Sequence, residues 1–537
     1  MRRTTVTIFL FLLWFTVASH CSGEDLLVTI GEKTTRITNP LKPDGYPDYL
    51  AALNSHFLGK STPENNLAVG LWKITGPVEL SPDLKPLFFR ALGIDDIPNK
   101  GDYLVDFATY YRQRLGVFDS DNSTLDEFKG KQKKYDDAYS FVMANKWTKE
   151  SHPEVFQWWK KNRSHIEAVL KITETRDQYY NPYILPHVSQ DGDNDQFAPE
   201  LISIPLPGAI QAREVARTLK VNAHYHLGNN DIDAAMRTSI ATHRIGRLTA
   251  RGGTLIEGLV GVAISGIAFS IDRQILTADT LNAKQLQEHL AQLRSLPAMP
   301  SFLDKINLSE RYMFLDAAIH VAKHGSSSLN LSDGSTDRPH PIVKELGKVF
   351  SSSFVDWDHV LRQGNYWYDE IYRTGSINNV HERTKQYAEF EKRLKTLARE
   401  TSDPVSLAKK VLLSGKSLPA ITSEQISNIM VGLMLPSLGA VISAEDRALM
   451  ESEIIQIGIV LELHYLKSKS YPSSLKALVG PLLKELPQDR FNEKGLSYQS
   501  TPKGYLLYSF GRDRQDNRGR SYDDEPSADD IVLKRQR

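Results

Sequence analysis

Apolar residues recur at alternating steps of three and four positions along most of this 537-residue chain. In the segment 153–176, for example, Val155, Trp159, Ile166 and Val169 share one face of a helix. This spacing predicts a mainly α fold, because a helix brings such positions onto one buried stripe. The predicted helices cover residues 125–145, 153–176, 212–227, 232–248, 255–276, 301–325, 357–372, 379–400, 421–433 and 443–467.

Two of these helices are separated by a short polar turn and predict a helical hairpin. The segments 212–227 and 232–248 flank Gly228-Asn229-Asn230-Asp231. Gly228 can end the first helix in the left-handed conformation, and Asn230 or Asp231 can cap the second. The turn is similar to that of a tetratricopeptide unit, but no second copy follows at the 34-residue period of such arrays. We therefore expect a body of helical hairpins without an extended repeat.

The first residues have the layout of an export signal. Arg2 and Arg3 precede the apolar run Val6–Val17, and the small residues Ala18 and Ser19 follow it. That run is shorter than the roughly 20 residues that cross a bilayer as a helix. We expect residues 1–22 to be a signal peptide, with cleavage between His20 and Glu24, and the protein to be periplasmic or extracellular. An uncleaved membrane anchor is the alternative.

The single cysteine, Cys21, excludes an internal disulfide framework, so stability has to come from buried apolar surface. The 65 basic and 65 acidic residues balance, which does not favour a nucleic-acid partner. The most apolar internal run, Leu259–Ile271, is too short to span a membrane and predicts a core helix. Beyond the signal, the expected regions are a helical part (24–200), a helical-hairpin domain (205–436) with a flexible loop at 325–341, and a C-terminal module (441–537).

Motifs with a defined chemistry are absent from the sequence. There is no H-E-x-x-H metal motif and no G-x-S-x-G nucleophile turn, so no residue can be assigned a catalytic or cofactor-binding role. Asp316, His320 and His324 share one helical stripe, which suits either a metal site or a solvated face.

The C-terminal module has a different pattern. A helix ends near Leu461, and two β-prone runs, Leu496–Tyr498 and Tyr505–Ser509, flank the turn at Pro502-Lys503-Gly504, which predicts a β-hairpin. Four short motifs occur in a fixed order around these runs: Tyr471-Pro472, Pro487-x-Asp489, Ser509-x-Gly511-x-Asp513 and Asp530-Ile531.

This order resembles the globular head of the type II secretion major pseudopilin, over roughly residues 445–533. The resemblance implies a small α+β module made of a helix and a short sheet. A pseudopilin begins with its own long apolar helix, whereas here the corresponding helix is internal and its apolar stretch, Ile454–Leu461, is short. The module therefore resembles a pseudopilin head that forms part of a larger chain, and it does not resemble a fibre subunit. The whole chain also resembles uncharacterised large exported bacterial proteins that end in such a module, for which no activity is implied.

The resemblance further implies a calcium ion in the loop after Gly511. The matching ligands are the side chains of Asp513, Asp529 and Asp530 and the carbonyl oxygen of Ser509. A solvated acidic loop, neutralised by nearby arginines, is the alternative.

These observations lead to one functional hypothesis and one rival. The hypothesis is an exported, non-enzymatic binding or scaffold protein with an unknown protein partner, because catalytic motifs are lacking and the related heads assemble. The rival is an exported hydrolase whose catalytic groups converge in space somewhere in residues 100–440, where motifs cannot reveal them.

Overall fold

A computed structural model describes residues 26–77, 80–115, 125–185, 200–325, 355–402, 417–435, 438–492 and 494–537. The signal peptide and nearly all of the loop predicted at 325–341 lie outside these residues. The described part is mainly helical, with one small antiparallel sheet near residue 537, so the predicted mainly α class with a C-terminal sheet is confirmed.

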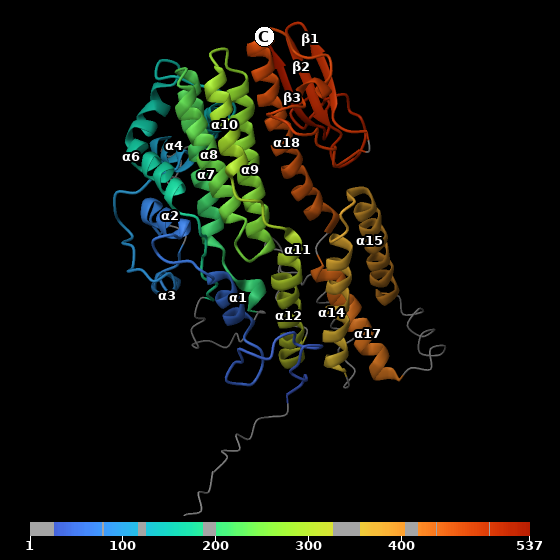
Figure 1. Ribbon diagram of the computed structural model, residues 1–537. Helices are drawn as coiled ribbons and strands as arrows, with labels where there is room; N and C mark the ends of the chain where they lie inside the picture. Colours follow the sequence, from blue (N-terminus) through green and yellow to red (C-terminus); the bar gives the residue numbers. More distant parts are fainter. Residues whose placement is uncertain are drawn as a thin grey trace, which may run out of the picture.

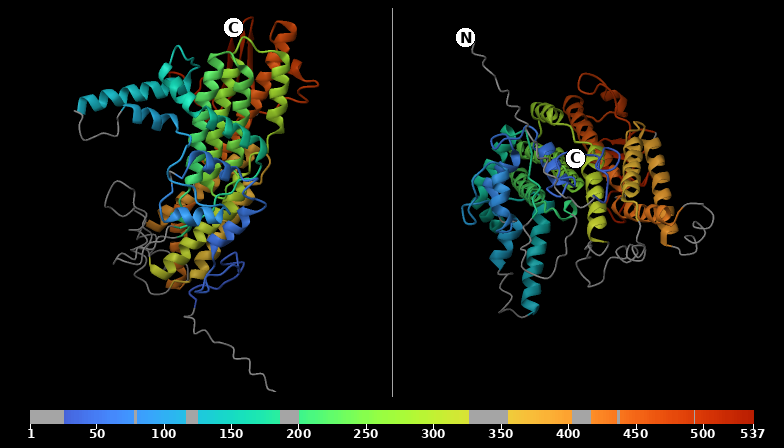
Figure 2. Two further views of the ribbon diagram at one scale, coloured as in Figure 1. Left: turned by 90° about the vertical axis from the view of Figure 1, so that its left-hand side faces the viewer. Right: turned by 90° about the horizontal axis from the view of Figure 1, so that it is seen from below.

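The upper half of the molecule is a layer of helices that lie side by side (Figure 1). In this half, α8 and α9 form the most extensive helix pair, and α7 packs against both. Figure 2 shows α4 and α5 projecting from this layer as an arm. The helices of this half are α2 (Leu67–Thr75), α3 (Leu84–Ala91), α4 (Phe107–Leu115), α5 (Leu125–Ala144), α6 (Pro153–Thr175), α7 (Pro207–Gly228), α8 (Ile232–Thr249), α9 (Leu255–Leu276) and α10 (Ala283–Ser295).

A second group of helices lies below this layer, and one long helix joins it to the C-terminal sheet (Figure 1). That long helix is α18 (Leu438–Ser468), which packs against α9, α10 and α15. The lower helices are α1 (Tyr49–Leu58), α11 (Phe302–Lys305), α12 (Arg311–His324), α14 (Trp357–Gly375), α15 (Val380–Ser402) and α17 (Leu418–Met434).

Local capping explains where several helices begin and end. Thr254 and Glu257 form a capping box at the start of α9, and Asp231 accepts a hydrogen bond from the Ala234 N–H at the start of α8. Gly325 ends α12 with φ of 80°. The segment predicted as helix 255–276 has the same bounds in the structure.

Gly228 differs from the prediction. It is the last residue of α7, and the residue in the left-handed conformation is Asn230, with φ of 58°. The reason is close packing, because a Cβ at position 228 would collide with the backbone carbonyl of Trp147. This glycine is therefore required for the approach of a neighbouring segment and not for the turn.

The helix predicted to begin at Ser443 begins earlier, at Leu438. Asp446, which lies inside this helix, forms an ion pair with Arg383 of α15 at 2.8 Å.

The interior consists of three clusters of buried apolar side chains. The first joins α2–α7 to α8 and α9, the second fills the lower helices, and the third lies between α7–α10, α18 and the sheet. Helix α9 contributes to all three, through Ile264, Leu255 and Ile275 respectively. The first two clusters take residues from both sides of position 205.

Among the described residues, α9 is long and apolar enough to cross a membrane by length and composition, and 56% of its most apolar window is buried. It packs against α7, α8 and α18 in the helical layer. Its solvent-facing side is nevertheless apolar, since Ile256 is 58% exposed and Leu259 is 36% exposed.

The C-terminal sheet has the order β1-β2-β3. The predicted hairpin is confirmed as β1 (Ser497–Thr501) and β2 (Gly504–Ser509). A third strand, β3 (Ile531–Gln536), pairs antiparallel with β2. The sequence did not predict this strand, because Lys534, Arg535 and Gln536 interrupt its apolar pattern. In the structure Arg535 nevertheless points inward. Its guanidinium donates hydrogen bonds to the carbonyl oxygens of Thr277 and Ala278, directly after α9.

Candidate functional site

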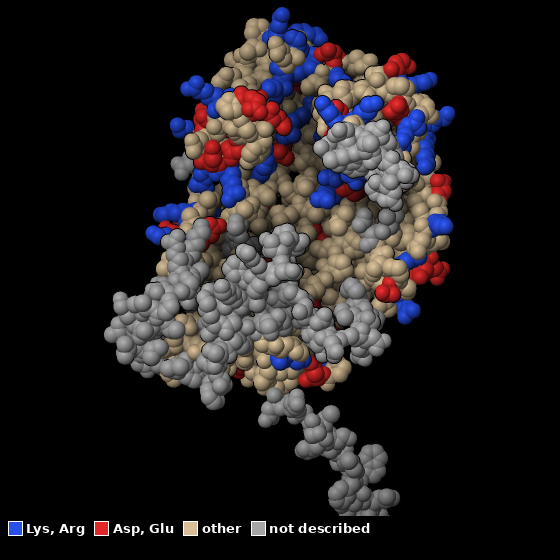
Figure 3. All heavy atoms as spheres, turned by 180° about the vertical axis from the view of Figure 1, so that it is seen from behind, with Lys and Arg blue, Asp and Glu red and all other residues tan. Residues whose placement is uncertain are grey.

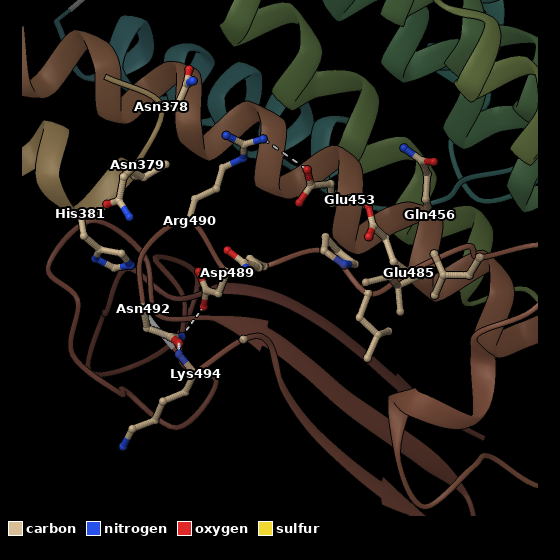
Figure 4. A pocket seen from close by; sticks show the side chains of 17 residues that line it. Asn378, Asn379, His381, Glu453, Gln456, Glu485, Asp489, Arg490, Asn492 and Lys494 are labelled. Carbon is tan, nitrogen blue, oxygen red and sulfur yellow. Dashed lines mark hydrogen bonds and ion pairs between the residues drawn. The ribbon is translucent and has the colours of Figure 1, made fainter. Parts of the chain in front are cut away.

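A polar cleft of about 830 Å³ separates the lower helices from the C-terminal module. Figure 4 shows its walls, which come from three segments distant in sequence. One wall is the turn between α14 and α15, the second is one face of α18, and the third is the irregular segment before β1. The residues that line it are Asn378, Asn379, Val380, His381, Glu453, Gln456, Ile457, Leu483, Glu485, Leu486, Pro487, Gln488, Asp489, Arg490, Asn492, Lys494 and Gly495.

Arg490 ties the module to the helical body at this cleft. Its guanidinium lies 3.3 Å from Glu453 and 3.6 Å from Asp446, both on α18. Arg383 pairs with the same Asp446, so that two arginines from separate segments share one buried carboxylate. Figure 4 shows the Arg490–Glu453 pair reaching across the cleft. These partly buried charges fix the walls relative to one another.

Asp489 holds the turn that forms the third wall. Its carboxylate is 3% exposed and accepts hydrogen bonds from the Phe491 N–H at 2.8 Å, the Asn492 amide at 2.5 Å and the Ser509 hydroxyl at 2.6 Å. Burial raises the pKa of Asp489, and these donors oppose the shift. Because both carboxylate oxygens of Asp489 already accept hydrogen bonds from the protein, this residue shapes the cleft and is not free to bind a ligand.

Glu453 differs from the other carboxylates that line the cleft, because one of its oxygens is buried without a hydrogen-bond partner among the described residues. Burial raises its pKa, Arg490 lowers it, and its Oε2 has no hydrogen-bond partner in the described part of the chain. An unsatisfied buried oxygen costs free energy.

Several other side chains at the cleft have no hydrogen bond or ion pair within the described ranges. They include amides, which can donate and accept, and charges of both signs. The site can therefore bind a polar ligand through groups that the fold itself does not use. These side chains are Asn378 and His381 on one wall and Glu485, Gln488 and Lys494 on the opposite wall.

Three of the four residues predicted to hold calcium lie in one loop. Asp529 accepts the Asp513 N–H at 2.9 Å, and Asp530 accepts the Gly519 N–H at 2.8 Å. The Ser509 hydroxyl donates to Asp489, and the role predicted for the Ser509 carbonyl oxygen stays a prediction. Seen from behind, acidic atoms gather over this module (Figure 3).

Burial affects two carboxylates of this loop, those of Asp529 and Asp530. Asp530 is fully buried, and one oxygen each of Asp529 and Asp530 has no partner in the described chain. Burial together with the charges of Asp516 and Asp529 raises the pKa of Asp530 to about 6, although the backbone donors Gly519 and Asn517 oppose the shift. Within the described residues, no three His, Cys, Asp or Glu side chains are arranged to hold a metal, and the calcium site stays a prediction.

The stripe of Asp316, His320 and His324 is not a fully solvated face. Asp316 is 7% exposed, and its Oδ2 accepts the Leu201 N–H at 3.0 Å. Burial raises its pKa to about 6. The two histidine rings lie 4.8 Å apart, and no metal-binding group forms around them in the described chain.

Sequence reasoning missed a buried polar cluster, formed by Ser239, His243, Asp272 and His289. Asp272 accepts hydrogen bonds from Ser239 Oγ at 2.5 Å, His243 Nε2 at 2.8 Å and His289 Nε2 at 3.0 Å. All four residues are at most 2% exposed. The available signal was weak: an aspartate inside an apolar helix, and Ser239 and His243 one helical turn apart.

Comparisons with protein-family models, with curated proteins and with solved structures found no match for this chain. The resemblance of the C-terminal segment to pseudopilin heads therefore rests on its motifs alone.

Proposed function

We propose that this chain is an exported, non-enzymatic binding or scaffold protein, and that the polar cleft binds an extended segment of a protein partner. The observation that carries the proposal is the set of polar and charged side chains that line the cleft without a protein partner in the described residues: Asn378, His381, Glu485, Gln488 and Lys494. Most of these side chains are exposed to solvent, so a partner can reach them.

An extended polypeptide fits this chemistry. Its backbone presents alternating donors and acceptors, and a side-chain amide can satisfy either. Charges of both signs at the rim, Glu485 and Lys494, would select the side chains of the partner and fix its direction. A volume of about 830 Å³ accommodates a few residues of such a segment.

Selection from a displayed peptide library against the full mature chain tests the proposal. Enriched peptides should bind the purified protein, and Gln488→Ala combined with Lys494→Glu should weaken binding by about tenfold or more. Lys284→Glu, on the exposed face of α10, is the matched control and should bind as the wild type does. If no peptide is enriched, or if the cleft variant binds unchanged, the cleft is not a polypeptide site.

Calcium binding by the loop 511–530 is part of the same proposal. It is supported by the buried, unpartnered oxygens of Asp529 and Asp530 and by the resemblance of the module to pseudopilin heads. The ion would bring carboxylates together that otherwise repel one another. Calorimetric titration of the full chain with Ca²⁺ is the direct test.

An exported hydrolase is the second candidate, favoured by the Ser239–His243–Asp272–His289 cluster, which lies within residues 100–440. A serine and a histidine on a shared buried aspartate are components of hydrolytic sites, but here Ser239 and His243 are fully enclosed. A hydrolytic activity of the wild type that is lost in a Ser239→Ala variant of unchanged melting temperature would replace the binding proposal.

A further inference from the structure

A second cavity, of about 360 Å³, lies among α6, α8 and α10, well separated in sequence from the polar cleft. Its floor is apolar and buried, since Met236 is 6% exposed and Ile240 is 3% exposed. Its volume lies in the range of sites for small organic molecules, and most of its other lining residues are polar or charged.

His289 forms one wall of the cavity and has a fixed orientation. Its Nε2 donates to Asp272, and its Nδ1 is buried and has no hydrogen-bond partner in the described chain. Burial alone would raise the pKa of Asp272, but His243 and His289 lower it well below its usual range, so the carboxylate is ionised. A ring anchored in this way by Nε2–H carries the lone pair on Nδ1 when it is neutral.

Arg244 is the cation of this cavity without a counterion. It is half-buried, and no ion pair or hydrogen bond of its guanidinium occurs in the described ranges. The neighbouring Arg237 differs, because Glu167 and Glu174 hold it at 2.7 Å and 2.8 Å.

No carboxylate that lines the cavity forms an ion pair with Arg244 in the described ranges. Glu174 pairs with Arg237, and Asp233 accepts the Gln285 amide at 2.7 Å. Glu288 is largely exposed and lies 3.9 Å from Lys284. A guanidinium presents a planar fork of donors that matches a carboxylate, so Arg244 can pair with the negative group of a ligand whose apolar part lies on Met236 and Ile240.

We propose that this cavity binds a small organic anion whose apolar part lies on Met236 and Ile240 and whose negative group pairs with Arg244. This site is independent of the cleft and of its proposed polypeptide ligand, because the two share no residue.

Three probes separate the contributions of charge and apolar area. Benzoate has both a carboxylate and a ring, acetate has only the charge, and benzyl alcohol has only the ring. Calorimetry and thermal shift of the full mature chain should show saturable binding of benzoate, with acetate and benzyl alcohol each weaker by about tenfold or more.

Substitution of Arg244 then tests the site itself. Arg244→Gln should weaken benzoate by about tenfold or more, Arg244→Lys should restore part of the affinity, and Lys476→Gln, at an exposed lysine of the C-terminal module, should leave it unchanged. An unchanged melting temperature of Arg244→Gln without ligand shows that the fold is intact. Absence of saturable benzoate binding, or equal binding by wild type and Arg244→Gln, would overturn the proposal.

Discussion

Asp272 is one of the most deeply buried acidic residues of the helical layer, and three donors hydrogen-bond to its carboxylate. A charged carboxylate in an apolar interior is costly unless it is paired and fully hydrogen-bonded. Ser239, His243 and His289 supply three hydrogen bonds from two helices other than its own. The cluster therefore links α8, α9 and α10 through one residue.

We expect Asp272→Asn to lower the free energy of unfolding by about 3–5 kcal/mol, because the amide leaves two buried imidazoles without their anion. Glu288→Gln is the control: Glu288 also pairs with a basic residue, Lys284, but the two side chains are 62% and 83% exposed, so the loss should stay below about 1 kcal/mol. Urea denaturation measures both. Equal losses for the two variants would contradict a special role for burial.

Two glycines should respond in opposite directions to alanine. Gly228→Ala should destabilise by about 1–3 kcal/mol, because the new Cβ would collide with the carbonyl of Trp147. Gly266→Ala lies in the interior of α9 with open space at its Cβ, and it should stabilise by about 0.5–1 kcal/mol through helix propensity. Melting curves of the two variants give the comparison, and a stabilising Gly228→Ala would refute the packing argument.

At the scale of elements, periodicity in the sequence was enough to place most helices, and the bounds of α9 agree with its predicted range. Strand β3 was missed because Arg535 occupies an inward position that an apolar residue normally takes. The cluster around Asp272 and the cleft could not be predicted either, since their residues come together only when helices pack. The three aspartates expected in the acidic loop lie together, and the role predicted for the Ser509 carbonyl oxygen stays a prediction.

The acidic loop should make calcium binding dependent on pH. The folded pKa of Asp530 is raised from 3.8 to about 6, so without calcium the fold should lose stability as pH rises from about 4 to about 6. Calcium favours the ionised carboxylate, so the rise in melting temperature at about millimolar Ca²⁺ should be larger near about pH 7.5 than near about pH 5.

Two variants of the same loop make this measurement specific. Asp529→Asn removes a carboxylate with a buried open oxygen and should abolish most of the calcium-induced shift. Asp523→Asn changes an exposed carboxylate outside the predicted ligands and should retain the shift. If wild type shows no shift at either pH, the loop is a metal-free part of the fold.

At the scale of the whole molecule, the third apolar cluster joins the C-terminal module to the helical layer. Ile531 and Leu533 of β3 share this cluster with Ile271, Ile275 and Leu276 of α9. A fragment of residues 438–537 would expose that surface, so we expect it to melt without a cooperative transition. The full chain should melt cooperatively, as followed by circular dichroism. A fragment with a sharp transition and a protected sheet would show that the module folds by itself.

The distance in sequence between these partners also has a consequence for biosynthesis. Arg535 binds the carbonyl of Thr277, 258 positions earlier in the chain. At translation rates of roughly 5–20 residues per second, strand β3 is synthesised on the order of 10 to 50 seconds after the end of α9, against which it packs. Throughout that interval the apolar surface that β3 covers in the folded chain is available to chaperones.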